Sequence, residues 1–139
     1  MKCVTILVLI FLACACGAGP VIPVSVQDLA NSMPDREVQI LCGVGEEYDL
    51  SADQLKLLLT IRRIENGRSG LEMGIGSNNP RHPARRFARH PDRSLRTQAR
   101  WASGTIQLHY TGNLDAFAKI YCPPKWKHWS RMARYWMEP

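Results

Sequence analysis

The sequence predicts a small, mainly α-helical domain that follows an N-terminal export signal. Apolar residues recur every three or four positions in several segments of the second two thirds of the chain, which is the period of an amphipathic helix. No long run alternates polar with apolar residues, so long strands are not expected. The one long apolar run lies in the first sixteen residues, and the roughly 123 residues that follow suffice for one compact domain.

The first sixteen residues have the layout of a signal peptide. Lys2 supplies a positive charge, Val4 to Ala15 form the apolar run, and the small residues around Ala15 fit cleavage before Cys16. The run is too short to span a membrane. The alternative is lipidation at Cys14 or Cys16, because the segment loosely resembles the lipobox of bacterial lipoproteins. In both cases we expect an exported protein: periplasmic, extracellular or tethered to a membrane by an N-terminal lipid.

Residues 17–48 are expected to be a tether and an N-terminal extension. Gly17 to Pro23 is a stretch of Gly, Pro and Val without a period, which is typical of a tether. A short helix is expected over residues 25–32, and the apolar run from Val38 to Cys42 favours a strand or an extended segment. The helical domain itself is expected to span residues 49–139.

The clearest helix is expected over residues 52–66. Ser51 followed three residues later by Gln54 is the capping-box pattern that starts a helix, and Asp53 places a negative charge in its first turn. Gly67 is expected to end the helix. Gly and Pro then recur at short intervals over residues 68–91, which predicts a long loop with one helical turn.

Three further helices are expected after this loop. Asp92 or Ser94 would cap the first of them, and Trp126 or His128 would begin the last. The helical turn in the loop and the three helices are expected over residues 84–89, 92–110, 114–121 and 126–137.

Charge is unevenly distributed along this chain, whose net charge is +6. Residues 26–53 carry seven acids and one base, whereas residues 81–100 carry seven arginines and one acid. Such a basic segment attracts polyanions: nucleic acid, anionic lipid or an anionic cell-wall polymer. For an exported protein the last two are the expected partners, and nucleic acid is not. The alternative is that the acidic segment folds against the basic one.

Cys42 and Cys122 are the two cysteines that follow the predicted signal. An exported compartment permits a disulfide between them, which would stabilise the fold by about 4–5 kcal/mol in the chain-entropy model. The alternative is two separate buried thiols. The chain has no Cys-x-x-Cys pair and its histidines lack ligand spacing, so neither a metal nor another cofactor is expected.

Glu65 is the leading candidate for a catalytic residue. Leu58 and Ile61 precede it by seven and four residues, which puts its carboxylate on a helix face otherwise meant for the core. A carboxylate there is destabilising unless it is paired or protonated. A protonated carboxyl group is also what general-acid chemistry on a glycosidic oxygen requires. The alternative is an ion pair with one of three nearby arginines that simply ends the helix.

The segment Ile61–Ile75, IRRIENGRSGLEMGI, resembles the helix-end E-[SN]-G signature of lysozyme-like peptidoglycan hydrolases. It is similar in particular to small phage and bacterial lysozyme-like proteins with the pattern I-R-x-x-E-x-G-x-x-G-x-E-[FM]-G-[IV]. The segments QARWASGTI (98–106), FAKIYCPP (117–124) and the tryptophan-containing last helix resemble later motifs of the same group. The resemblance covers about residues 52–137 and implies a lysozyme-like helical domain.

This resemblance implies that Glu65 is the general acid of a glycosidase. Glu72, on the loop after Glu65, is then the first candidate for a second carboxylate. It would orient Glu65, bind substrate or hold an attacking water, or else have only a structural role. Tyr121 is a candidate for a hydrogen bond to the substrate or to the carboxylate, or else a core aromatic residue.

The tryptophans divide into two groups. Trp126 lies between two lysines, and we expect it to be the most exposed of the four and a candidate to stack on sugar rings. Trp129 and Trp136 share one helical face and are expected in the core.

The sequence therefore leaves two functions open. The first is an exported, monomeric peptidoglycan hydrolase or lytic transglycosylase that uses Glu65 alone as its acid, with attack by a placed water or by the substrate itself. The second is a non-catalytic module that binds cell wall or an anionic membrane surface through the arginines of residues 81–100. The second function predicts salt-sensitive binding that does not need Glu65.

Overall fold

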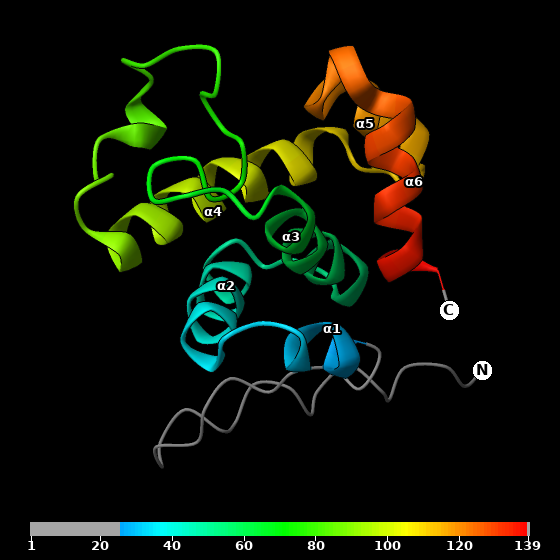
Figure 1. Ribbon diagram of the computed structural model, residues 1–139. Helices are drawn as coiled ribbons and strands as arrows, with labels where there is room; N and C mark the ends of the chain where they lie inside the picture. Colours follow the sequence, from blue (N-terminus) through cyan, green and yellow to red (C-terminus); the bar gives the residue numbers. More distant parts are fainter. Residues whose placement is uncertain (1–25, 139) are drawn as a thin grey trace.

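A computed structural model describes residues 26–138 of the protein (Figure 1). All regular structure in these residues is helical, which confirms the prediction of a mainly α chain. The predicted signal peptide, its cleavage or lipidation site and the tether lie outside the described residues. The helices are α1 (Gln27–Asn31), α2 (Asp35–Glu47), α3 (Ala52–Glu65), α4 (Pro91–His109), α5 (Leu114–Tyr121) and α6 (Trp126–Met137), with 3₁₀ turns η2 (Pro83–Arg85) and η3 (Pro123–Lys125).

Helix α3 is the centre of the fold. It contacts α1, α2, α4 and α6, and in Figure 1 it lies between α2 and α6 with α4 running behind. It starts with the predicted capping box: Ser51 Oγ accepts from Gln54 N at 3.2 Å, and Gln54 Oε1 accepts from Ser51 N at 3.0 Å. Leu57, Leu58 and Ile61 are fully buried, so burial on several sides holds the helix that ends in Glu65.

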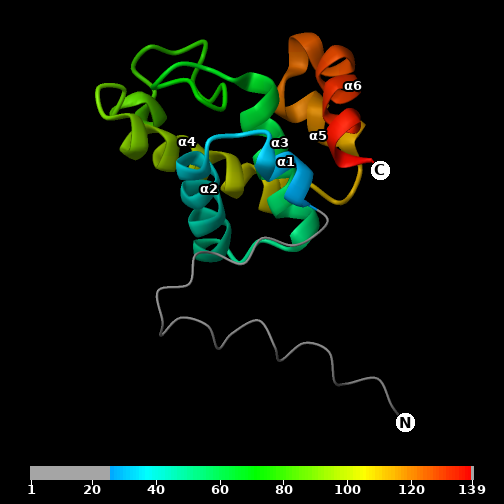
Figure 2. The ribbon, with the colours of Figure 1, turned by 60° about the horizontal axis from the view of Figure 1, so that its bottom comes forward.

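The expected strand or extended segment at Val38 to Cys42 is wrong, because these residues belong to helix α2. Leu41 and Cys42 follow Val38 by three and four residues, and these side chains face the core, as Val44 does. Burial on one helical face here overrides the weak preference of a short apolar run for extended structure. Helix α2 packs against α3 and α4 (Figures 1 and 2).

The expected domain boundary at residue 49 is also wrong for the described residues. Val26, Leu29, Leu41 and Val44 are buried in the same hydrophobic core as the later helices. The segment expected to be an N-terminal extension therefore forms one side of the domain.

The helices after the loop lie close to their predicted positions. Helix α5 has the predicted bounds, and α6 begins at the first of the two expected residues, Trp126. Helix α4 begins at Pro91, with His90 at its N-cap and no side-chain cap. Neither Asp92 nor Ser94 caps it, because Asp92 pairs with Arg36 and Ser94 bonds to the preceding loop. No helix of the described residues is long and apolar enough to cross a membrane.

Three ion pairs connect α2 to the rest of the molecule. Arg62 of α3 binds Glu37 of α2 at 2.8 Å, and Arg100 of α4 binds Glu47 at 2.9 Å. The third is Arg36–Asp92. The acidic N-terminal segment thus does pack against the middle of the chain, but through only one arginine of residues 81–100.

Cys42 and Cys122 are both free thiols. Cys42 is buried in α2, and Cys122 is half-buried after α5. Of the two alternatives that the sequence left open, the structure has the separate thiols. Burial, together with the nearby charge of Glu46, raises the pKa of the Cys42 thiol to about 11.

Candidate active site around Glu65

Glu65 lies at the last position of α3, where the chain turns sharply. Asn66 adopts a left-handed conformation with φ 42°, and its backbone N–H donates to the carbonyl of Arg62. Gly67 follows where no side chain fits, because a Cβ atom there would lie 1.8 Å from the carbonyl oxygen of Leu71. The Glu-Asn-Gly sequence therefore ends the helix and starts the loop that returns past the carboxylate.

The loop returns to Glu65 at Gly74. Gly74 has φ +73°, and a Cβ atom at this position would lie 2.9 Å from Oε2 of Glu65. A side chain at position 74 would thus strain the backbone and collide with the carboxylate. Glycine here leaves one side of the carboxyl group against bare backbone.

Trp129 of α6 holds the other carboxyl oxygen. Its indole Nε1–H donates to Oε1 of Glu65 at 2.9 Å, and the residue is 2% exposed. The indole packs against Phe117 and Tyr121, with ring centroids 5.9 and 5.5 Å away. Trp129 is in the core, as predicted, but the sequence did not reveal that it also orients Glu65.

The environment of Glu65 favours its protonated form. Burial raises the pKa of the Glu65 carboxyl, and the hydrogen bond from Trp129 opposes this rise in part. By contrast, a hydrogen bond from Arg36 lowers the pKa of Asp92, and hydrogen bonds from Ser130 and then Arg134 lower the pKa of Asp115.

The arginines near Glu65 do not pair with it. Arg62 instead binds Glu37 and the carbonyls of Gly67 and Glu72. Arg63 lies over the ring of Trp136 at 5.5 Å. Within residues 26–138 no ion pair involves Glu65. The alternative of an ion pair that merely ends the helix therefore lacks its cation.

Glu72 has contacts that belong to the loop and to α4. It is buried, and its Oε2 accepts from Gly70 N and from Ser94 Oγ, both at 3.0 Å. Its other oxygen has no hydrogen-bond partner among the described residues. These contacts match the structural role that the sequence left open for Glu72.

Tyr121 binds the loop beside Glu65. Its hydroxyl donates to the carbonyl of Met73 at 2.6 Å, next to the glycine that touches Glu65. Burial, followed by the charge of Glu65, raises the pKa of Tyr121 well above its ordinary value. Tyr121 therefore fixes the loop rather than presenting its hydroxyl to solvent.

The expectation that Trp126 is the most exposed tryptophan is wrong. Trp126 is half-buried, and two ammonium groups lie near its ring, with Lys119 Nζ 4.7 Å and Lys127 Nζ 5.7 Å from the ring centroid. The exposed indole is Trp101 of α4, at 45%. Trp126 packs against the hydrophobic core, which the sequence order alone does not reveal.

Gln98 of α4 fixes the loop and was not identified from the sequence. Its Oε1 accepts from Ile75 N at 3.1 Å, and its Nε2 donates to the carbonyls of Ile75, Ala84 and Gly70 at 3.0, 3.1 and 3.2 Å. The side chain is fully buried. Its signal in the sequence is a long polar residue among Leu95, Ala99 and Ala102 on the buried face of a helix.

The basic segment is largely unpaired. Arg81, Arg85, Arg86, Arg89, Arg93 and Arg96 form no ion pair with any of residues 26–138, and all but the half-buried Arg85 are exposed. Arg86 and Arg93 both lie over the ring of Phe87, at 4.5 and 4.1 Å. We call these six residues the arginine surface.

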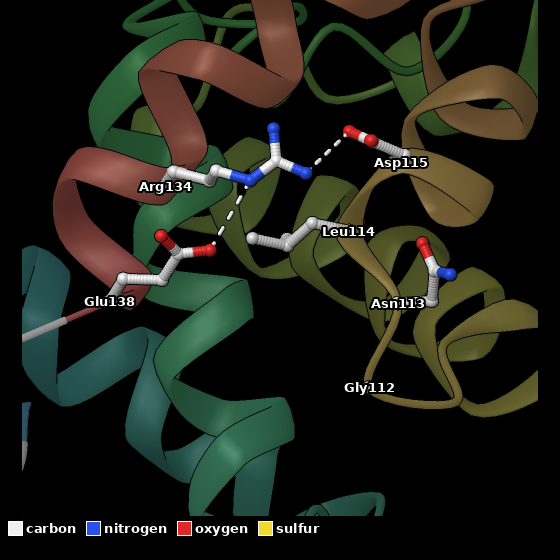
Figure 3. Close-up of a pocket in the computed structure, with 6 residues that line it drawn as sticks. All are labelled: Gly112, Asn113, Leu114, Asp115, Arg134 and Glu138. Atoms are coloured by element: carbon white, nitrogen blue, oxygen red, sulfur yellow. Dashed lines mark ion pairs between the residues drawn. The ribbon is translucent and has the colours of Figure 1, made fainter.

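Two other features do not extend the site. A hollow of about 340 Å³ lies between the start of α5 and the end of α6. Arg134 lines it and binds Asp115 at 2.8 Å and Glu138 at 3.2 Å (Figure 3). Its charged groups pair with one another, and none of the residues around Glu65 lines it.

No three His, Cys, Asp or Glu side chains of residues 26–138 are placed to hold a metal ion together.

Comparisons of the chain with protein-family models, with curated proteins and with solved structures gave no match.

Proposed function

We propose that this protein is exported and cleaves the glycan strands of peptidoglycan, with Glu65 as the general acid. The observation that carries this proposal is the Glu65 carboxyl group: it is half-buried, has no ion pair among the described residues and has a raised pKa. An acid catalyst needs this combination, because it must still hold its proton when the substrate binds. The lysozyme-like motif that surrounds Glu65 suggests the substrate class.

In the proposed reaction, protonated Glu65 donates its proton to the glycosidic oxygen while the bond from that oxygen to the anomeric carbon breaks. The leaving sugar departs as an alcohol, and the anomeric carbon takes on oxocarbenium character. A hydroxyl group then attacks this carbon, and the Glu65 carboxylate accepts the proton that the hydroxyl loses. Water as the attacking group gives a reducing sugar, whereas the 6-hydroxyl of the same sugar gives an anhydro product.

A single carboxylate fits the side chains around Glu65. Glu72 is bound to the loop and to α4, Asp115 is bound to Arg134, and Asp92 is bound to Arg36. None of them is available as a partner carboxylate like that of retaining glycosidases. Trp129 orients the acid, and Gly74 leaves it a face of bare backbone.

The test is the release of soluble fragments from purified peptidoglycan. The parent protein should release fragments, and Glu65→Gln should lower the rate by at least about a hundredfold, because the amide cannot donate an acidic proton. Wall binding should persist in the variant, as measured by sedimentation with the insoluble wall. Glu46→Gln is the matched control, since Glu46 is exposed and forms no ion pair with residues 26–138.

Two results would contradict the proposal. One is equal fragment release by the parent and by Glu65→Gln. The other is no release by the parent from any wall preparation, which would favour a non-catalytic module that binds the wall.

The arginine surface supports a second candidate function, a non-catalytic module that binds an anionic cell-wall polymer or membrane surface. Its six guanidinium groups have no carboxylate partner among the described residues, so they are available to phosphate or carboxylate groups outside the chain. Replacing Arg81, Arg86 and Arg89 with Gln should then weaken wall binding and its salt dependence. Replacing Lys125, Lys127 and Arg131, which are also exposed, is the control of equal charge.

A further inference from the structure

Trp101 and His82 form an exposed aromatic pair that the residues around Glu65 do not use. Trp101 lies on α4 and His82 on the loop before η2, with ring centroids 4.8 Å apart and planes at 65°. The indole is 45% exposed. A single exposed apolar residue is ordinary on a protein surface, so what matters is how the two rings are held.

The histidine ring is fixed by the loop. Its Nδ1 accepts the backbone N–H of Ala84 at 3.2 Å, so the neutral ring carries its proton on Nε2. Gly76 lies directly against it, because a Cβ atom at position 76 would be 2.6 Å from Cβ of His82. Glycine at this position lets the loop backbone lie close to the histidine, which stays in contact with the indole.

Both rings keep a hydrogen-bond donor for a ligand. Neither Nε2 of His82 nor Nε1 of Trp101 donates to a protein atom within residues 26–138. The pair therefore combines a flat apolar surface with two N–H groups. Sugars need both, since one face of a pyranose ring carries C–H groups and its rim carries hydroxyls.

The pair is connected to Glu65 by a short run of loop backbone. Gly74 touches the Glu65 carboxylate, and Gly76, two residues later, touches His82. Between them, Ile75 is bound through both its N–H and its carbonyl to Gln98, one helical turn before Trp101. The position of the aromatic pair relative to the acid is therefore set by hydrogen bonds between the loop and the buried side chain of Gln98.

We propose that Trp101 and His82 form a sugar-binding subsite for the glycan strand whose cleavage is proposed at Glu65. A pyranose ring of the strand stacks on the exposed indole, and Nε2 of His82 donates to one of its hydroxyl groups. The inference rests on the proposed function for its ligand class, a chain of β-linked N-acetylated sugars. Trp101 is a binding residue that acts away from the bond that breaks.

The test measures the affinity for a soluble β-1,4-linked tetramer of N-acetylglucosamine by titration calorimetry. The Glu65→Gln background prevents cleavage of the probe. Trp101→Ala in this background should weaken binding about tenfold or more, because the stacking surface is lost. Trp101→Leu, which keeps an apolar group without a flat face, should weaken binding similarly and guards against a local effect of the alanine. Tyr135→Ala, which removes an aromatic ring that is 77% exposed on α6, should leave the affinity unchanged.

The same background gives a spectroscopic readout. The indole N–H resonance of Trp101 in ¹H–¹⁵N spectra should shift on addition of the tetramer, whereas the resonance of buried Trp129 should move less. Assignment is direct, because the Trp101 signal disappears in either Trp101 variant.

The inference is overturned if the background protein does not bind the tetramer, or if Trp101→Ala binds it as tightly as the background. Equal losses in Trp101→Ala and Tyr135→Ala would overturn it too. Fragment release that depends on Glu65, with tetramer binding that does not depend on Trp101, would leave the proposed function standing without this subsite. Binding that depends on Trp101, with no fragment release, would keep the subsite and remove the proposed cleavage.

Discussion

At the scale of single residues, the protein places a carboxyl group where its charge is disfavoured. Glu65 is half-buried at the end of the central helix, and of the arginines near it Arg62 binds Glu37 and Arg63 lies over Trp136. One oxygen takes the indole N–H of Trp129, and the other lies against Gly74. The conflict between position and charge was visible in the sequence, because Leu58 and Ile61 set the face on which Glu65 lies. Its indole partner was not visible, because it is 64 residues away in the chain.

The raised pKa of Glu65 predicts how Glu65→Gln changes stability. Between the ordinary pKa of a glutamate and the raised value, the folded protein binds more protons than the unfolded chain, so the free energy of unfolding falls as the pH rises through this window. Glutamine has no charge to bury and keeps an oxygen for Trp129. We therefore expect Glu65→Gln to be more stable than the parent at neutral pH.

This gain should disappear as the pH falls below about 4.3, where the glutamate is protonated in both states. Urea unfolding of both proteins at a series of pH values measures the difference. A variant that is less stable than the parent at neutral pH would indicate that Glu65 has a cationic partner there.

At the scale of elements, the loop between α3 and α4 is held by buried polar groups rather than by secondary structure. Gln98 binds three of its carbonyls, and Ser94 and Glu72 bind Gly70. The glycines of the loop occur where the backbone has positive φ or approaches another group closely. The motif that suggested a family is thus the set of residues that brings the loop back to Glu65.

Gln98→Leu should destabilise the protein by about 2–4 kcal/mol, because it leaves several buried backbone groups of the loop without partners. The amides of Met73 and Ile75, which now donate to Oε1 of Gln98, should also exchange hydrogen faster. Urea unfolding and amide exchange measure the two effects. Gln39→Leu on the exposed face of α2 is the control, and it should change stability by no more than about 0.5 kcal/mol.

Local signals in the sequence predicted some elements and not others. The capping box at Ser51 and the proline pair after α5 are local, and helices α3 and α5 have close to their expected bounds. The error at α2 has a different origin, because Val38 and Ile40 favour extended structure in isolation and become helical only through burial against α3 and α4. The position of Trp126 likewise depends on Lys119, which comes from another helix.

At the scale of the whole molecule, the N-terminal helices complete the domain. Val26, Leu29, Leu41 and Val44 are almost fully buried, and each apolar side chain of this size contributes about 1.5–3 kcal/mol when it is removed from water. Glu37 of α2 also pairs with Arg62, which is itself 9% exposed. Without α2 this buried guanidinium would have no carboxylate, which is strongly destabilising.

A chain that begins at Asp49 should therefore fail to fold, whereas one that begins at Gly17 should unfold cooperatively with heat. Far-ultraviolet circular dichroism during heating distinguishes the two. Cooperative unfolding of the shorter chain would show that α1 and α2 are dispensable and would restore the boundary that the sequence suggested.

The measurement that tests the central claim most directly is the titration of the Glu65 carboxyl group by ¹³C NMR. Glu65→Gln identifies the resonance by its absence. We expect a pKa above the ordinary value of about 4.3, because burial without a cation disfavours the charged form. A pKa at or below the ordinary value would mean that Glu65 is a charged, stabilised carboxylate, and this would contradict its assignment as a general acid.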